Sequence, residues 1–169
     1  ARNLTQGAIF AAMVFAVTPN EAAALQFKLT KPADYETYNV TVEGPSAATS
    51  GRFQAGPFLL TDQSDKSNSF IAWCFDLIGT VRFGGEYAYQ EIDFLEDDER
   101  TRVQRLFDAS YHTVDGSPIE TVKGQAFQLA VWNTIYDTDF DIEDGDFKAT
   151  AASPTDDIIE EAQALLTLA

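Results

Sequence analysis

The side chains best suited to take part in a chemical reaction are those of Cys74, the only cysteine, and His112, the only histidine. A cysteine thiolate is a nucleophile and a histidine can serve as a general base. One cysteine and one histidine are too few ligands for a transition-metal site, so no metal and no other cofactor is predicted. A single cysteine cannot form an internal disulfide either. Cys74 is therefore expected to be sealed in the core or to take part in chemistry.

Gln128 is the third residue of interest, because its surroundings predict that its carboxamide is buried. In the segment GQAFQLAVWNTIYD, the positions three, four and seven residues after Gln128 are apolar. A helix would place Gln128 on this apolar, core-facing stripe. A buried amide without partners is costly, so its oxygen and nitrogen must be engaged. Gln125 lies on a neighbouring face and is expected to remain in solvent.

The first 24 residues have the features of a secretory signal peptide. Arg2 provides a positive start, Gly7–Val17 is an apolar run too short to span a bilayer, and Pro19 interrupts it. Ala22–Ala24 fits the small-residue cleavage rule, which predicts cleavage after Ala24. The protein is therefore expected to be secreted or displayed at the cell surface. An unpaired thiol in such an oxidising compartment invites oxidation unless it is protected or used.

The composition predicts one acidic globular domain, residues 25–169. The chain has 169 residues, 45% hydrophobic residues and a formal net charge of −16, enough apolar material for one core. The negative charge and the absence of a Lys/Arg stripe disfavour nucleic acid and anionic membrane surfaces as partners. No stable membrane insertion of the mature domain is expected. The acidity is typical of a protein kept soluble after export.

The patterning predicts an α+β fold, with a β-rich first half and a helical second half. The predicted strands are Leu25–Thr30, Tyr38–Val42, an apolar segment Phe53–Leu60, the long Ser69–Ile78, and a hairpin of Thr80–Phe83 with Glu86–Ile92 around Gly84-Gly85. The predicted helices follow Glu96–Glu99, span about Thr121–Tyr136, and begin at Ser153 with Pro154. Ser69–Ile78 is apolar on both faces, which indicates a central strand covered on both sides.

Two segments resemble bacterial thioester domains. Ala126–Trp132 (AFQLAVW) is similar to their Gln-x-Ala-hydrophobic-Trp motif, and Phe70–Leu77 (FIAWCFDL) is similar to the segment around their cysteine. The order of these motifs, with Tyr136-Asp137 and Gly145–Phe147 after them, also resembles exported proteins that carry a PEP-CTERM sorting tail. Many thioester domains have a hydroxyl residue before the glutamine, where this chain has Phe127.

The resemblance implies an internal thioester between Cys74 and Gln128 and a β-sandwich or barrel joined to a helical part. The thiolate would attack the carboxamide and expel ammonia, and a donor would hold the oxyanion. The side chains implied around the thioester, as shielding or as a modulator of the thiol, are Trp73, Phe75, Asp76, Phe127 and Trp132. The implied function is covalent adhesion at the cell surface or in extracellular matrix. The implied partner is a surface protein or polymer bearing primary amines.

Two other interpretations remain open at this stage. Cys74 can be an inert buried residue in a non-reactive exported structural or binding module, with Gln128 bonded to nearby backbone. A cysteine hydrolase or transglutaminase would use Cys74 as nucleophile, His112 as base, and Asp115 or Asn133 to orient the base. The sequence lacks a cysteine-protease signature or a Gly-flanked elbow. We therefore expect at most one covalent event and not an enzyme.

The acidic stretch 137–146 (DTDFDIEDGD) has alternating carboxylates of the kind that bind calcium. It does not follow the EF-hand pattern, because its glycine is displaced and the terminal glutamate is absent. A solvated acidic loop is the favoured interpretation.

Overall fold

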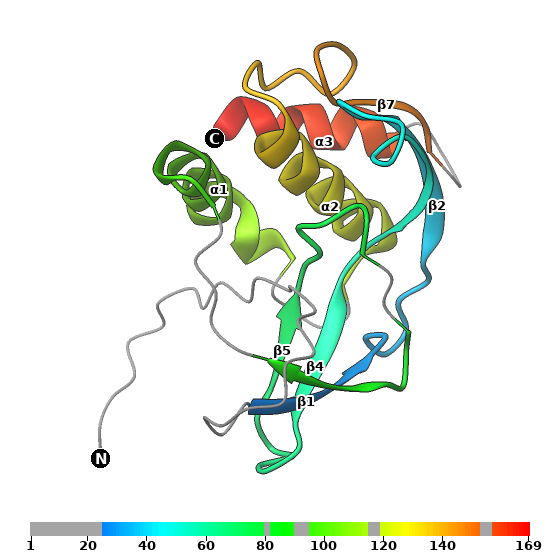
Figure 1. Cartoon of the computed structure of the whole chain (residues 1–169), viewed down its shortest axis with the longest axis vertical. Helices are drawn as coiled ribbons and strands as arrows, with labels where there is room; N and C mark the ends of the chain where they lie inside the picture. Colours follow the sequence, from blue (N-terminus) through cyan, green and yellow to red (C-terminus); the bar gives the residue numbers. More distant parts are fainter. Residues whose placement is uncertain (1–24, 80–81, 90–94, 115–118, 153–156) are drawn as a thin grey trace.

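The protein is represented by a computed structural model that describes residues 25–79, 82–89, 95–114, 119–152 and 157–169 (Figure 1). The predicted signal peptide, residues 1–24, lies outside the described residues, as do Ser153 and Pro154. The described elements are β1 (Leu25–Thr30), β2 (Tyr38–Glu43), β3 (Gly51–Ala55), β4 (Phe58–Asp62), β5 (Ser69–Ala72), β6 (Glu86–Tyr89), α1 (Asp97–Ser110), the 3-10 helix η1 (Tyr111–Thr113), α2 (Thr121–Tyr136), β7 (Lys148–Ala152) and α3 (Asp157–Leu168). The predicted α+β class is confirmed.

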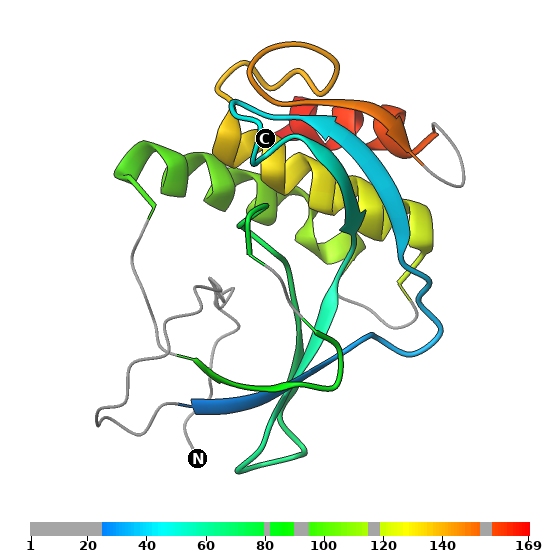
Figure 2. The same ribbon diagram turned by 45° about the vertical axis from the view of Figure 1, so that its right-hand side comes forward.

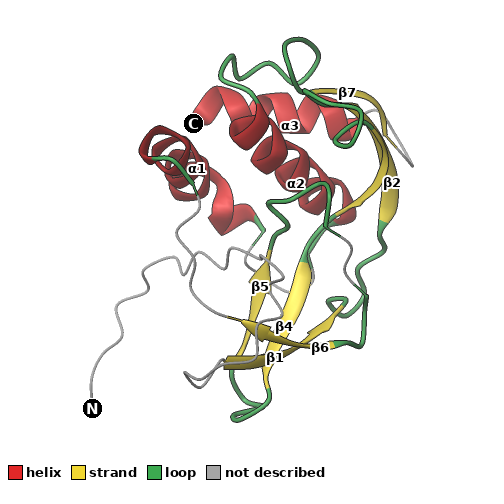
Figure 3. Ribbon diagram, viewed as in Figure 1, coloured by secondary structure: helices red, strands yellow, loops and turns green. Residues whose placement is uncertain are grey.

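The strands form two antiparallel sheets, with the orders β5-β4-β1-β6 and β3-β2-β7. The sheet β3-β2-β7 curves beside α2 and α3, whereas β5-β4-β1-β6 extends away from the helices (Figures 2 and 3). In the described residues, neither sheet closes into a barrel or sandwich, so the finer architecture expected from the resemblance is not seen. The strand β7, which pairs with β2 after the second long helix, was not predicted.

The chain passes from one sheet to the other at Gly56-Pro57, between β3 and β4. Gly56 has φ +142°, and a Cβ there would lie 2.5 Å from the hydroxyl oxygen of Tyr35. Both the backbone conformation and the close approach therefore require glycine. Pro57 lacks an N–H, so it cannot continue a strand ladder as a donor.

This corner explains why β5 is shorter than predicted. The last pair between β4 and β5 joins Phe58 to Ala72, so the next residues of β5 would face Pro57 and Gly56. With that partner lost, the chain leaves the sheet before Cys74. The prediction of a strand through Ile78 was wrong, and Ile78 is 65% exposed rather than covered.

The hairpin around Gly84-Gly85 was also predicted with the wrong partner. β6 pairs with β1, and Gly84 N–H donates to the Leu29 carbonyl at 2.7 Å. Residues 80–81 and 90–94 lie outside the described residues, and Arg82 and Phe83 are not part of a strand. The glycines therefore direct the chain back onto β1.

Two hydrophobic clusters fill the molecule. The larger one joins the helices to the sheet β3-β2-β7, and the smaller one lies on the sheet β5-β4-β1-β6 around Leu29 and Leu60. Cys74 packs against both clusters. The cysteine thus lies at the junction between the two parts of the core.

Asp137 fixes the loop between α2 and β7. Its Oδ1 accepts from the N–H groups of Thr138 (2.6 Å) and Asp139 (3.3 Å), and its Oδ2 accepts from Phe147 N–H at 2.8 Å. Burial opposes ionisation of this carboxyl, but the backbone donors outweigh it and hold its pKa below the usual range. The carboxylate therefore stabilises the folded loop only while it is charged.

We predict that Asp137→Asn lowers the free energy of unfolding at neutral pH by about 1–3 kcal/mol, because Asn has no charge and keeps only one of the two oxygens that accept backbone N–H groups. A carboxyl group whose pKa is lower in the folded than in the unfolded protein stabilises the fold fully at pH values above its unfolded pKa. This stabilisation is lost as the pH falls through the folded-state pKa. The difference from wild type should therefore shrink below about pH 4. Urea unfolding across pH measures it, with Asp144→Asn as an exposed control. A pH-independent difference would contradict the account.

Candidate functional site

The side chain of Gln128 and the backbone of Cys74 form a reciprocal pair of hydrogen bonds. Cys74 N–H donates to Gln128 Oε1 at 3.0 Å, and Gln128 Nε2 donates to the Cys74 carbonyl oxygen at 2.7 Å. The two residues are 54 positions apart in the sequence, and Gln128 is completely buried. The structure therefore brings the predicted pair into direct contact.

This pairing compensates for the early end of β5. Beyond Ala72 the strand β4 offers no further partner, so the N–H and C=O of Cys74 need others. One carboxamide presents a donor and an acceptor side by side, as a neighbouring strand does. Gln128 satisfies both backbone groups and has its own polar atoms satisfied in return.

A second contact attaches the same segment to α2. Leu77 N–H donates to the hydroxyl oxygen of Tyr136 at 3.3 Å, two helical turns after Gln128. Tyr136 also stacks on Phe147, with ring centroids 6.1 Å apart. Burial, opposed by this hydrogen bond and reinforced by the nearby acidic groups Asp76 and Cys74, raises the pKa of Tyr136. The segment from Cys74 to Leu77 is thus held along α2 at two points.

The thiol of Cys74 points to the carbonyl oxygen of Asp76, at 2.9 Å. Burial raises the pKa of Cys74 to about 11, the hydrogen bond to Asp76 lowers it, and the Asp76 charge raises it further. The Asp76 carboxylate itself accepts from Ile78 N–H at 2.7 Å. Cys74 remains partly exposed. The resting thiol is therefore protonated and largely buried, in a residue that is itself partly exposed.

Aromatic rings on residues next to Cys74 and Gln128 in the sequence pack against one another in the core. Trp73 packs on Phe127 with ring centroids 4.7 Å apart, Phe127 packs on Phe107 at 5.1 Å, and Phe75 lies 6.4 Å from Phe107. Trp73, Phe75 and Phe127 are at most 3% exposed. These rings are therefore part of the dry core next to the site.

The two hydrogen bonds place the Gln128 carboxamide beside the residue that carries the thiol. The donor N–H of Cys74 polarises the Gln128 carbonyl, and the amide nitrogen, which would leave, is held by the Cys74 carbonyl. The sulfur belongs to the residue whose backbone holds the amide, and it is turned to the Asp76 carbonyl.

The residues of the alternative hydrolase site are not brought together in the described residues. His112 is exposed on η1, and no hydrogen bond joins it to Cys74 in the described part of the chain. Asn133 is buried, and its Nδ2 donates to the carbonyls of Asp141 (3.0 Å) and Phe147 (3.2 Å). Asp115 lies outside the described residues.

The acidic loop also differs from a metal site. Its carboxylates accept backbone N–H groups, such as those of Asp141 and Glu143, within the loop itself. Among the described residues, no group of three or more His, Cys, Asp or Glu side chains could hold a metal ion.

Sequence analysis placed Gln125 in solvent, and this was wrong. Gln125 is 0% exposed, and neither amide atom has a hydrogen-bond partner among the described residues. The helix is covered on all sides from Gly124 to Thr134, so its apolar stripe is not its only buried face. The near-continuous apolar character of this segment was the available signal.

Comparisons with protein-family models, with curated proteins and with solved structures found no match to this chain. In the part of the chain that the structure describes, every helix is too short or too polar to cross a membrane.

We predict opposite effects from removing the two buried amides of α2. In a Cys74→Ala background, where no thioester can form, Gln128→Leu should lower the free energy of unfolding by about 2–4 kcal/mol, because two backbone groups at position 74 lose their partners. Gln125→Leu should be neutral or stabilising, because it removes polar atoms that have none. Urea unfolding measures both. Equal losses for the two variants would contradict the assigned role of Gln128.

We also predict a high pKa for Cys74 wherever it is a free thiol. Its alkylation rate in the folded protein should keep rising above pH 9 toward about pH 11, because burial disfavours the thiolate. The urea-unfolded chain serves as the control and should level off near its ordinary value of 9.0. A plateau of the folded protein at or below the unfolded value would show that the thiol is not shielded.

Proposed function

We propose that the protein attaches covalently to an amine-bearing ligand through an internal thioester between Cys74 and Gln128. The observation that carries the proposal is the reciprocal hydrogen bonding of the Gln128 carboxamide with the Cys74 backbone at 3.0 and 2.7 Å. It supports the proposal because it holds a nucleophile-bearing residue and an electrophilic carbonyl together across 54 residues of sequence. The fold supports it too, with the cysteine after a strand and the glutamine in a helix, as the resemblance to thioester domains implies.

The proposed formation step needs no co-reactant. The Cys74 sulfur attacks the carbonyl carbon of Gln128, the thiol proton passes to the amide nitrogen, and the carbon–nitrogen bond breaks to release ammonia. The N–H of Cys74 stabilises the negative charge on Oε1. The high thiol pKa makes the thiolate scarce at neutral pH, so formation is expected to be slow and to happen once, after folding.

The proposed attachment step is aminolysis. A primary amine of the ligand attacks the thioester carbonyl, forms an amide with the side chain of residue 128, and returns the thiol to Cys74. The reaction consumes the thioester, so the protein acts once and is not a turnover enzyme. The rings of Trp73, Phe75, Phe127 and Trp132 would slow hydrolysis by water before the amine arrives.

The proposed setting is the cell surface or extracellular matrix of a bacterium, after export directed by residues 1–24. The net charge of −16 favours cationic, lysine-rich surfaces as ligands over polyanions. Cys74 is partly exposed, which supports access by a side-chain amine from outside.

A non-reactive exported structural or binding module is the second candidate, and one observation favours it. Both hydrogen bonds of Gln128 go to backbone, and the Cys74 sulfur is turned to the Asp76 carbonyl. That arrangement suffices to hold the segment after β5 on α2 with an inert cysteine.

Intact-mass measurement separates the two candidates. With a thioester, the folded protein should be lighter than its sequence mass by one ammonia, and methylamine should add one molecule and expose one thiol to alkylation. Cys74→Ala and Gln128→Glu are the controls, and both should show their full mass. A wild-type protein of full mass with an alkylatable Cys74 after denaturation would refute the thioester and leave the second candidate.

A further inference from the structure

Two buried tryptophans carry indole N–H groups that have no hydrogen-bond partner. They are Trp73 and Trp132, each 2% exposed, and neither Nε1 has an acceptor among the described residues. An indole N–H can only donate, and leaving it unpaired in the core costs free energy. An unpaired donor beside a reacting group is of interest, because an acceptor can develop there during the reaction.

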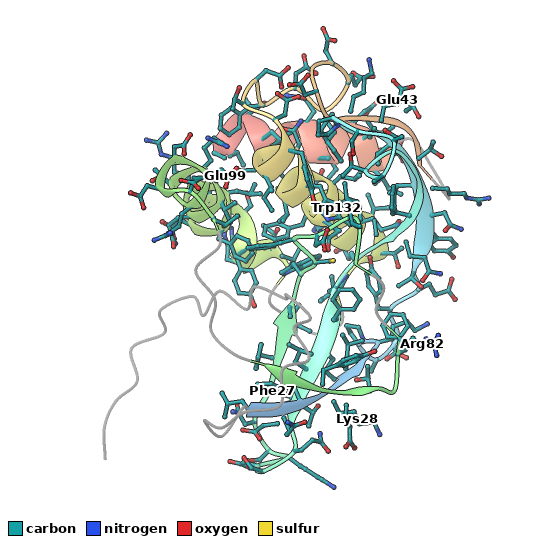
Figure 4. All side chains as sticks on the ribbon, viewed as in Figure 1. Phe27, Lys28, Glu43, Arg82, Glu99 and Trp132 are labelled. Atoms are coloured by element: carbon teal, nitrogen blue, oxygen red, sulfur yellow. The ribbon has the colours of Figure 1, made fainter. Side chains whose placement is uncertain are left out.

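Trp132 lies one helical turn after Gln128 on the same face of α2. Positions four apart on a helix are neighbours, and a long helical side chain leans back toward the N-terminus. Trp132 and Gln128 are therefore neighbours on one face of α2. The ring of Trp132 meets Phe53 of β3 edge-on, with centroids 6.3 Å apart, which fixes it on the side of α2 that faces the strands (Figure 4).

The carbonyl oxygen of Gln128 has one donor at rest, the N–H of Cys74 at 3.0 Å. A carbonyl oxygen has two lone pairs, and a tetrahedral oxyanion is stabilised most when more than one donor reaches it. A donor that is unpaired in the resting state and paired in the transition state lowers the barrier, because its bond is not already made with the reactant.

We infer that the indole N–H of Trp132 is the second donor to the Gln128 oxygen when the thioester forms and when an amine opens it. This inference rests on the proposed thioester. During each step the carbonyl carbon becomes tetrahedral, Oε1 gains negative charge, and the oxygen receives hydrogen bonds from Cys74 N–H and Trp132 Nε1–H. Collapse of the intermediate returns the carbonyl and releases ammonia in the first reaction or the Cys74 thiol in the second.

Trp73 provides a matched control. It is buried to the same extent and has an equally unpaired N–H, but its ring packs on Phe127, on the face of α2 about 100° from Gln128. Replacing either tryptophan by phenylalanine removes the N–H and keeps an aromatic ring. A purely structural role predicts similar consequences for both substitutions.

The experiment measures the rate at which methylamine opens the thioester in wild type, W132F and W73F, by intact mass. We expect W132F to open about 100-fold more slowly, the loss typical of removing one oxyanion donor. Trp73 belongs to the proposed shield and is not a proposed donor, so we expect W73F to open no more slowly than wild type. Urea unfolding should show that the two substitutions lower the free energy of unfolding by similar amounts. A difference in opening rate then comes from the reaction and not from loss of stability.

Each other outcome overturns the inference in a recognisable way. A wild-type rate in W132F would refute the donor role while leaving the thioester intact, and faster opening would show that Trp132 acts only as a shield. Equal slowing in both variants would indicate loss of packing. A wild-type protein of full mass would refute the proposed function itself. If W132F does not fold, a second variant is made in the W73F background, where Trp132 is the only tryptophan left. Benzothienylalanine replaces Trp132 and exchanges its N–H for sulfur at nearly constant shape. An opening rate equal to that of W73F would also refute the donor role of Trp132.

Discussion

The arrangement of the molecule depends on how the backbone of Cys74 is hydrogen-bonded. The strand β5 loses its neighbour where Pro57 turns the chain between sheets, and a buried N–H and C=O must then be satisfied elsewhere. Gln128 supplies both partners from the middle of a helix. Because of this contact, the segment after β5 lies against α2 rather than continuing the sheet. The two clusters of the core meet at Cys74 for the same reason.

The same contact sets the chemistry available at this position. As a carboxamide, the Gln128 side chain makes two hydrogen bonds and stabilises the fold. As the acyl group of a thioester it would have no nitrogen and would keep only the hydrogen bond from the Cys74 N–H to its oxygen. Loss of the nitrogen would leave the Cys74 carbonyl without its donor, so a covalent bond would replace part of the hydrogen-bonded support. The structural and the reactive interpretations therefore use one geometry and differ in whether the sulfur leaves the Asp76 carbonyl.

The parts of the fold that were predictable are those with strong local patterns. The strand Leu25–Thr30 has the predicted bounds because its alternation agrees with the burial of Phe27 and Leu29. The helix Thr121–Tyr136 also has the predicted bounds, although it is buried on all faces rather than on one stripe. The prediction of a strand as far as Ile78 was wrong because Pro57 sets where β5 ends. Pro57 is distant along the chain, and its effect on β5 follows only from the pairing register of β5 with β4. The pairing of β7 with β2 is likewise non-local. The juxtaposition of Cys74 and Gln128 was expected from the motif resemblance, and the engagement of the Gln128 amide from its buried position. The identity of its partners, the N–H and C=O of Cys74, came from the structure.

The polar residues of α2 show why this helix can organise such distant segments. From Gly124 to Thr134 the helix is buried, so each polar side chain there needs a partner or a reason to lack one. Thr134 donates to the Ala130 carbonyl within the helix, Asn133 donates to the loop before β7, and Gln128 pairs with Cys74. Each of the last two attaches a segment that no strand pairing secures. Several buried polar atoms have no partner among the described residues: on α2 the Gln125 amide, the Trp132 N–H and the Asn133 Oδ1, and elsewhere the Trp73 N–H and the Ser110 hydroxyl. Gln128 differs from Gln125, the buried amide three residues earlier, because both its oxygen and its nitrogen are paired. That pairing joins α2 to the segment after β5, which no strand secures.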